Sequence, residues 1–319
     1  MGNVKSFFKI LKKLLIATII VLALGTTVFT YWIGSQIGEG VLHQNNAYNV
    51  RENSINELSK YGYDIAAFQN KYDINDVEFM AEDGKKVKGI YVKGKTENTA
   101  VLIHGNGGDY VSTYPLADLY LQNGWSILAY NQRGCEKTDK DLVTFGYLEQ
   151  KDTKAAVDYI KSKCNAKKIV VHGQSLGAAT AGFYASTEHA NTNINYVILD
   201  SAMENMTEMF LPVWHKMNEY NIPDDYTIFA TNIYLKINYG FTFEDVDIAK
   251  AQSSNNLPTL VIQGTKDTVC PVKMGENIYA NIVSDKKQYW ETDAVHIGSL
   301  YQYPEEYQQR IKMLIQEMQ

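Results

Sequence analysis

The sequence predicts an α/β protein with a mostly parallel, doubly wound sheet of eight strands, preceded by one transmembrane helix. Three observations predict it: a charge-free apolar stretch near the N-terminus, short apolar runs that alternate with helical patterns, and a long segment without strand signals between two of those runs. Short buried strands alternating with helices favour a parallel sheet, because each helix carries the chain back across the sheet before the next strand.

The N-terminal stretch from Leu14 to Ile33 has 20 residues and no charge. At ~1.5 Å per residue such a helix covers ~30 Å, the thickness of a bilayer's hydrocarbon core. Four lysines and no acidic residue precede it, and Tyr31 and Trp32 lie at its far end, where aromatic rings favour the headgroup region. This asymmetry predicts a cell-membrane anchor with a cytoplasmic N-terminus and with the residues after Ile33 outside the cytoplasm.

Two other interpretations of this stretch are less favoured. A cleaved signal peptide has a shorter apolar core of ~7–15 residues and an A-x-A-like cleavage site, which we do not find. A buried core helix would not have such lopsided flanks. We therefore expect residues 1–33 to form the basic flank and anchor, residues 34–50 a linker rich in Gly, Gln and Asn, and residues 51–319 the remaining domain.

Composition excludes several classes of protein. The formal net charge is -6, and outside the four N-terminal lysines 26 basic residues stand against 36 acidic ones. No basic excess is available to neutralise phosphates, so we expect no nucleic-acid partner. Three cysteines are too few for a disulfide scaffold or a multi-cysteine zinc module.

The strands follow in order along the chain. Asp83-Gly84 predicts a hairpin turn between Val77–Met80 and Val87–Val92, which makes the sheet mixed. Six further strands are expected at Ala100–Ile103, Ser126–Tyr130, Lys168–Val171, Tyr196–Leu199, Thr259–Ile262 and Gln288–Trp290. Helical patterns are expected at Arg51–Tyr61, Pro115–Gln122, Gln150–Lys163, Leu176–Ser186, Met274–Ile282 and Pro304–Met318.

One region interrupts this alternation. Residues 201–254 lie between two predicted strands, carry no clear strand signal and are rich in aromatic residues. Segments of that length inside a compact domain are usually functional. We interpret this one as an inserted helical cap, whose aromatic rings either bind an apolar acyl or aryl group or pack the cap's own helices.

The most informative motif is G-x-S-x-G at residues 173–177, centred on Ser175. It follows a predicted strand and begins a helix of small residues, which is the context in which this motif presents a nucleophile. The sharp turn places the serine hydroxyl at the sheet's C-terminal edge, beside the N–H groups of a helix N-terminus. The alternative is a glycine-rich turn that only packs a helix on the sheet.

A serine nucleophile requires a general base, and the base requires an orienting acid. In this architecture the chain order is Ser, then Asp or Glu, then His. His189, His215 and His296 follow Ser175, and only His296 comes shortly after the last predicted strand. We therefore expect His296 to be the base.

The acid is expected to be Asp267, which follows the strand Thr259–Ile262. Asp200 also follows a strand directly and is its main rival, whereas Asp293 is too near His296 in sequence to orient it easily. Asp267 could alternatively only shape the loop before Pro271.

An oxyanion hole requires two N–H donors. One is expected from the backbone of Leu176, the residue after the nucleophile, and the other from the glycine-rich residues 104–108. We choose the Asn106 N–H, with Gly107 as the second choice.

With these residues the chain resembles the α/β-hydrolase superfamily over about residues 51–318. It looks most like membrane-anchored hydrolases of Gram-positive bacteria, similar to serine-aminopeptidase-like and cinnamoyl-esterase-like members. The resemblance lies in His104-Gly105-Asn106-Gly107-Gly108, Asn131-Gln132-Arg133-Gly134, the G-x-S-x-G, Gly264-Thr265-Lys266-Asp267 and His296. It implies an α/β-hydrolase fold, nucleophile Ser175, acid Asp267, base His296, and oxyanion donors Asn106 and Leu176.

The chain departs from that family in one loop. Many relatives have Asp where Asn131 stands, and Gly and Ser after the Arg-Gly, where this chain has Cys135 and Glu136. Arg133 is therefore either a structural hydrogen-bond donor or a clamp for a substrate carboxylate. Cys135 and Cys270 both follow strands, and the sequence leaves open whether they pair in an exported protein.

The expected activity is that of a serine hydrolase cleaving carboxylic esters or related acyl compounds through an acyl-enzyme. A peptidase or aminopeptidase, or an acyltransferase on the same triad, is the alternative, and a non-catalytic surface binding protein is less favoured. No metal or organic cofactor is implied. The expected partners are a small-molecule acyl substrate and the membrane, and the oligomeric state stays open.

Overall fold

The computed structural model describes residues 2–43, 49–135 and 142–317. It divides into two compact units. The first combines the N-terminal helix α1 with the segment Val213–Phe243, and the second comprises Leu42–Pro212 and Glu244–Gln319.

The second unit is built on a sheet of eight strands within the described residues, in the order β1-β2-β4-β3-β5-β6-β7-β8. β1 pairs antiparallel with β2, and β2 antiparallel with β4; every other pairing is parallel. The predicted mostly parallel sheet is confirmed. The strands are Ile74–Met80 (β1), Lys86–Val92 (β2), Thr99–Ile103 (β3), Ser126–Tyr130 (β4), Ile169–Gln174 (β5), Tyr196–Asp200 (β6), Thr259–Gly264 (β7) and Lys287–Thr292 (β8).

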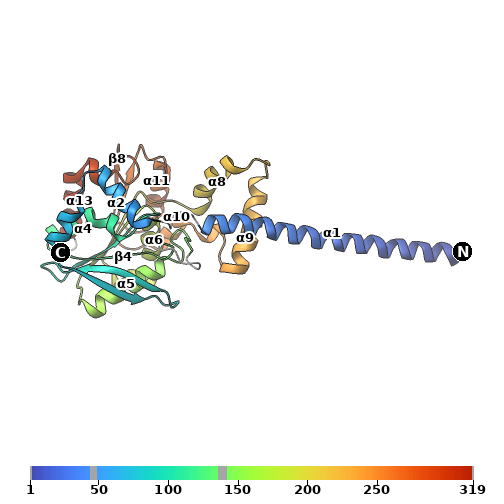
Figure 1. Ribbon diagram of the computed structural model, residues 1–319, viewed down its shortest axis with the longest axis horizontal. Helices are drawn as coiled ribbons and strands as arrows, with labels where there is room; N and C mark the ends of the chain where they lie inside the picture. Colours follow the sequence, from blue (N-terminus) through green and yellow to red (C-terminus); the bar gives the residue numbers. More distant parts are fainter. Residues whose placement is uncertain (1, 44–48, 136–141, 318–319) are drawn as a thin grey trace. The chain divides into compact units, whose positions relative to one another are not determined.

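Helices cover both faces of this sheet (Figure 1). One face carries the main apolar core, in which residues such as Leu102, Ile198 and Ile262 pack against Tyr120 and Tyr307. The helices on that face are α2 (Val50–Lys60), α3 (Ile65–Lys71), α4 (Tyr114–Gln122) and α13 (Pro304–Glu317), with the short η2 (Tyr110–Thr113) and α12 (Ser299–Gln302). The opposite face carries α5 (Gln150–Lys163), α6 (Leu176–Ala185), α10 (Ile248–Ala251) and α11 (Val272–Asn281).

The short helices α3 and α7 (Glu188–Asn193) were not predicted from the sequence. Each is only six or seven residues long, too short for a helical period to stand out. Side-chain caps define both starts: Asp64 accepts a hydrogen bond from the Ala67 N–H, and Thr187 accepts one from the Ala190 N–H.

The segment inserted between β6 and β7 is helical, as its lack of strand signals predicted. Its helices are α8 (Met206–Met217), α9 (Asp224–Tyr239), η3 (Phe243–Asp245), α10 and η4 (Gln252–Ser254). Only Val213–Phe243 belongs to the first unit, together with α1.

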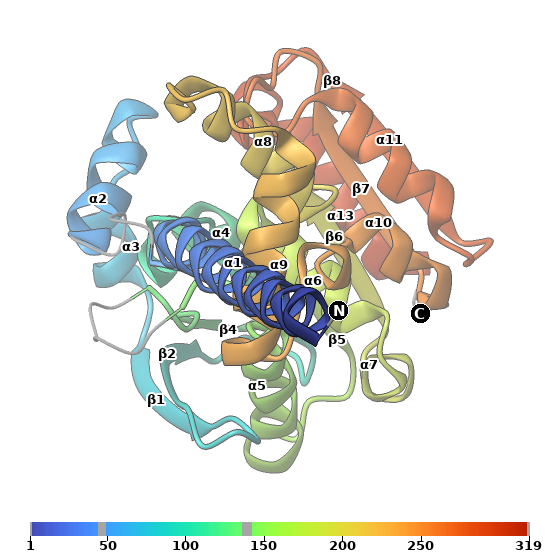
Figure 2. The same ribbon diagram turned by 90° about the vertical axis from the view of Figure 1, so that its right-hand side faces the viewer.

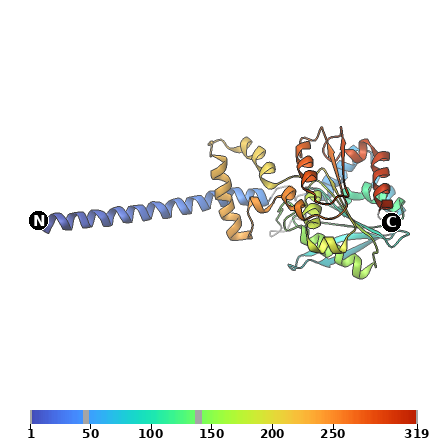
Figure 3. The same ribbon diagram turned by 180° about the vertical axis from the view of Figure 1, so that it is seen from behind.

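Helix α1 spans Gly2–Leu42 without interruption (Figure 3). From Ser6 onward it is long and apolar enough to cross a membrane, with a mean hydropathy of 2.2 over its most apolar window. The linker predicted to begin at Gly34 is therefore wrong over residues 34–42, which are helical.

The glycines in that stretch serve close packing rather than flexibility. A Cβ on Gly34 would lie 2.0 Å from the Ala230 carbonyl oxygen, and a Cβ on Gly38 would lie 2.6 Å from the Tyr234 ring. Both glycines let the backbones of α1 and α9 approach, so a glycine-rich composition resembles that of a linker although the segment is a packed helix.

Candidate active site

Ser175 lies in the sharp turn between β5 and α6, with φ 55° and ψ −119°. A side chain in this left-handed region costs of order 1–3 kcal/mol, and such strain is usual at functional sites. Glycines on both sides make the turn possible: a Cβ on Gly173 would lie 2.0 Å from the Gly177 oxygen, and one on Gly177 would lie 2.2 Å from the Ile103 oxygen. Steric contacts thus explain why both fixed glycines of the motif are needed, and the turn that they allow holds Ser175 in its strained conformation.

The structure brings Ser175, His296 and Asp267 together, all within the second unit. The His296 Nε2 lies 2.8 Å from the Ser175 Oγ, and the His296 Nδ1 lies 2.7 Å from the Asp267 Oδ2. With the proton on Nδ1 donated to the carboxylate, Nε2 is free to accept the serine proton.

The Asp267 carboxylate is well held for this role. Its side chain is fully buried, whereas that of His296 is 19% exposed. Its other oxygen, Oδ1, accepts hydrogen bonds of 2.8 Å from the backbone N–H groups of Val269 and Cys270. These donors satisfy a buried charge and fix the plane of the carboxylate.

The two rival acids are engaged elsewhere. Asp200 is buried beneath the nucleophile and accepts hydrogen bonds from Gln174, Tyr307 and Ser201, and burial raises the pKa of its carboxyl group. Asp293 is on the surface and accepts from the Lys266 Nζ at 2.8 Å. Neither is hydrogen-bonded to His296 among the described contacts.

The other two histidines after Ser175 are hydrogen-bonded to other residues. His189 is hydrogen-bonded to Tyr184 and Asp158 on the surface of the second unit. His215 is paired with Asp224 within the first unit.

Ser201 is a residue that sequence reasoning missed. Its hydroxyl donates to Asp200 at 3.0 Å and accepts from the Ile297 N–H at 3.1 Å, which ties the loop carrying His296 to the end of β6. Both Ser201 and Ile297 have positive φ, of 57° and 49°. No local pattern indicated this contact, which joins residues 96 positions apart.

The glycine-rich loop at residues 104–108 is anchored by a buried histidine. His104 bonds its own loop through Nδ1 and the Gly105 oxygen at 2.7 Å, and its Nε2 accepts from the Gln132 N–H at 3.1 Å. The Gln132 side chain donates to the His104 oxygen and accepts from Thr180 of α6. Burial lowers the pKa of His104, which keeps the ring neutral, as this pattern requires.

This loop forms one wall of a cavity of about 330 Å³ that opens at Ser175. Gly105 and the exposed Asn106 line it, and a Cβ on Gly105 would lie 3.3 Å from the Ser175 Cβ. Leu176 is the first residue of α6, where backbone N–H groups have no partner inside the helix. Both predicted oxyanion donors thus belong to segments next to the nucleophile.

Residues of α2 and of the C-terminal part of the chain also line the cavity. Glu57 of α2 faces the cavity, beside the stacked rings of Tyr61 and Tyr301, whose centroids are 3.7 Å apart. Burial raises the pKa of the Glu57 carboxyl group, against the lowering effect of Lys60 and His296.

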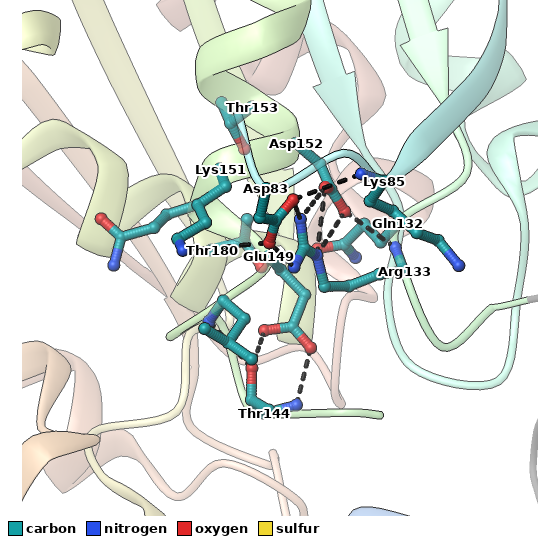
Figure 4. A network of polar contacts seen from close by, with 12 residues as sticks. Asp83, Lys85, Gln132, Arg133, Thr144, Glu149, Lys151, Asp152, Thr153 and Thr180 are labelled. Atoms are coloured by element: carbon teal, nitrogen blue, oxygen red, sulfur yellow. Dashed lines mark hydrogen bonds and ion pairs between the residues drawn. The ribbon is translucent and has the colours of Figure 1, made fainter. Parts of the chain in front are cut away.

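Arg133 has a structural role rather than that of a substrate clamp. Its guanidinium bonds Asp152, with an Nη2–Oδ1 distance of 2.5 Å, and Asp83 in the β1–β2 turn, with an Nη1–Oδ2 distance of 2.6 Å (Figure 4). The Arg133 side chain is 8% exposed, and its guanidinium is paired with two carboxylates of this chain instead of facing a substrate. The arginine therefore ties the hairpin turn to α5.

Cys135 and Cys270 are both buried, and both are thiols that are not joined in a disulfide. The Cys135 Sγ donates to the Gly108 oxygen at 3.1 Å, beside the glycine-rich loop. Among the described residues, no group of three or more His, Cys, Asp or Glu side chains is placed to hold a metal ion.

Comparison with known families and proteins gives the same architecture. A family model described as alpha/beta hydrolase fold matches residues 99–235. The uncharacterized protein YqkD of Bacillus subtilis is 24% identical over 84% of this chain and 87% of its own length. The proline iminopeptidase of Saccharolobus solfataricus is 35% identical, over 36% of this chain and 37% of its own.

Solved structures resemble the chain in fold. The esterase Pf2001 of Pyrococcus furiosus superimposes with a TM-score of 0.63 at 22% identity, covering 80% of this chain and 94% of the esterase. The predicted α/β-hydrolase fold is confirmed by this match together with the family model.

Proposed function

We propose that this chain, whose residues 99–235 match the family model for the alpha/beta hydrolase fold, is a serine hydrolase that cleaves carboxylic esters through an acyl-enzyme on Ser175. The observation that carries the proposal is the arrangement of His296, which is hydrogen-bonded to the Ser175 Oγ on one side and to a fully buried Asp267 on the other. A hydroxyl activated in this way is a nucleophile for acyl groups.

In the first half of the reaction, the Ser175 Oγ attacks the substrate carbonyl while its proton passes to the His296 Nε2. Asp267 holds the ring in the required tautomer and stabilises the imidazolium that forms. The carbonyl oxygen becomes an oxyanion, which the Asn106 and Leu176 N–H groups stabilise; each such donor is typically worth roughly 2.7–4 kcal/mol of barrier.

The intermediate then collapses, the bond to the alcohol breaks, and the leaving oxygen takes the proton from His296. In the second half a water molecule gives its proton to His296 and attacks the acyl-enzyme. The acid is released, and the proton returns to the Ser175 Oγ.

A fluorophosphonate probe tests the nucleophile directly, because it phosphonylates an activated serine. We expect the native protein to be labelled and Ser175→Ala to remain unlabelled. Ser253→Ala, which removes a surface hydroxyl bonded to the Lys250 oxygen, is the matched control and should be labelled like the native protein. Equal labelling of Ser175→Ala would contradict the proposal.

An aminopeptidase or aminoacyl esterase is the second candidate, and Glu57 is the observation that favours it. Its partly buried carboxylate lines the cavity with Ser175, and within the described residues no hydrogen bond ends on it. Such a carboxylate suits the ammonium group of an aminoacyl substrate. The local similarity to a proline iminopeptidase supports the same candidate.

Glu57→Gln separates the two candidates, because it keeps the size of the side chain and removes the charge. We would measure kcat/KM for an aminoacyl ester and for the same ester without its amino group. If the protein recognises amines, the ratio of the two values falls at least tenfold in the variant. An unchanged ratio leaves the simple ester as the substrate class.

We further propose that α1 is a retained membrane anchor with the hydrolase domain outside the cytoplasm. The lysine-rich start supports this orientation. Contacts of both Thr30 and the later Gly34 and Glu39 with helix α9 support retention, since cleavage after the apolar stretch would divide the α1 surface on which α9 packs. To test this, a tag is placed at the C-terminus and protease is added to intact cells. We expect the protease to digest the tag, and we expect the mass of the untreated protein to be that of the full-length chain.

A further inference from the structure

Helix α9 crosses the C-terminal part of α1 (Figure 2), and residues near both of its ends contact that part of α1. Near its start, the Tyr226 hydroxyl lies 2.9 Å from the Thr30 Oγ1. At its end, the Tyr239 hydroxyl donates to Glu39 at 2.8 Å. Between them, Gly34 of α1 lies against the backbone of Ala230.

α9 also has apolar residues on a second side, which is largely exposed. Phe229, Ile233 and Ile237 follow Tyr226 at intervals of three and four residues, so the four share one side of the helix. Phe229 is 58% exposed and Ile237 is 67% exposed. We call Phe229, Ile233 and Ile237 the outer face of α9.

The contacts with α1 show at which level of that helix α9 lies. Tyr226 bonds Thr30 and Asn238 bonds Tyr31, at the end of the apolar stretch, whereas Tyr239 bonds Glu39. Thr30 lies nine residues, or ~13 Å along the helix axis, closer to the N-terminus than Glu39. α9 therefore lies beside the part of α1 where the apolar stretch ends.

The α1 side chains at this level have the character of a membrane interface. Phe29 and Trp32 are 54% and 55% exposed, and aromatic rings are enriched where hydrocarbon meets headgroups. Val213, Met217 and Tyr220, in the same unit, are 55%, 69% and 87% exposed. The exposed apolar surface of α1 thus continues onto the segment Val213–Phe243.

We propose that helix α9 lies in the membrane interface, with its outer face buried among lipid acyl chains. The proposal rests on α1 being the membrane anchor. Lipid is the occupant because the outer face is continuous with the surface that α1 would present to the bilayer, and because a helix with one apolar side suits the interface plane.

The experiment uses the full-length protein in lipid nanodiscs with an environment-sensitive fluorophore on a single introduced cysteine. The positions are Phe229→Cys and Ile237→Cys, with Val283→Cys as the control, since Val283 is an equally exposed apolar residue (53%) in the second unit. Leu22→Cys, in the middle of the apolar stretch, reports on the anchor itself.

We expect blue-shifted emission at positions 229 and 237 that lipids spin-labelled near the headgroup quench at least twofold, and neither effect at position 283. Emission and quenching at 229 and 237 equal to those at 283 would overturn the proposal. A blue shift without lipid quenching would also overturn it, because it would mean that protein, such as a second copy of the chain, covers the face. At position 22, absence of quenching by lipids spin-labelled deep in their acyl chains would instead remove the anchor on which the proposal rests.

Discussion

The hydrogen bond between Asp267 and His296 decides the tautomer of His296, the proposed catalytic base. In Asp267→Asn, the amide can present its N–H to the ring, which favours the proton on Nε2 and blocks acceptance of the serine proton. We expect kcat for ester hydrolysis to fall by about 10⁴-fold with little change in folding.

Asp200→Asn is the matched control for that variant, since Asp200 is also buried near the nucleophile but is bonded to Gln174, Tyr307 and Ser201. We expect its kcat to fall far less than that of Asp267→Asn. A larger loss of kcat in Asp200→Asn than in Asp267→Asn would indicate that Asp200, and not Asp267, is the acid.

Ser201 is expected to position His296 through the Ile297 N–H. Ser201→Ala and Ser201→Gly both remove the hydroxyl. Both should therefore raise the activation barrier by about 1 kcal/mol, which lowers kcat several-fold and leaves KM nearly constant. The two differ in backbone strain: at a φ of 57°, Gly avoids the ~1–2 kcal/mol that Ala incurs. The melting temperature of Ser201→Gly should therefore be higher than that of Ser201→Ala. If both variants are as active as the native protein, this contact does not contribute to catalysis.

At the scale of elements, the contact between α1 and α9 depends on glycine. Gly34→Leu would force a side chain into the Ala230 carbonyl, 2.0 Å from the Cβ position, and should separate the two helices. We expect faster limited proteolysis between residues 213 and 243. Gly25→Leu is the control in the same helix, because no atom lies within 4 Å of its Cβ position, and it should be cleaved like the native protein.

Elements also show where local pattern was informative. The strands β3–β7 were predicted because each contains a short apolar run that stands out in the sequence, and the hairpin because Asp-Gly favours a tight turn. The end of α1 was predicted wrongly because glycines such as Gly34 and Gly38 occur both in flexible linkers and where two helices cross closely. Only the position of α9 shows that these two lie at a helix crossing.

For the molecule as a whole, His172 makes stability depend on pH. It is fully buried between the Tyr120 and Tyr307 hydroxyls, and burial lowers its pKa to about 3. Below an unfolded pKa of ~6.5, the unfolded chain binds a proton that the folded protein excludes, so the free energy of unfolding falls as the pH falls from about 6.5 toward 3.

The slope from this one residue is at most about 1.4 kcal/mol per pH unit. His172→Phe removes the titrating group at similar volume. Denaturant unfolding at pH 4 to 7 should show the stability of the native protein falling more steeply toward acid than that of the variant. Parallel curves would show that His172 does not contribute to the acid sensitivity.

The sequence by itself determined the fold class and the candidate nucleophile, base and acid, because these depend on local patterns and chain order: a strand before a G-x-S-x-G turn, and a His after the last strand. Tertiary structure decided what no local pattern contains. The bond from Ser201 to the His296 loop, the Gln132 link behind the glycine-rich loop and the packing of α9 on α1 join residues far apart in the chain. Such contacts depend on which surfaces the completed sheet and helices bring together, and a short segment of sequence does not contain that information.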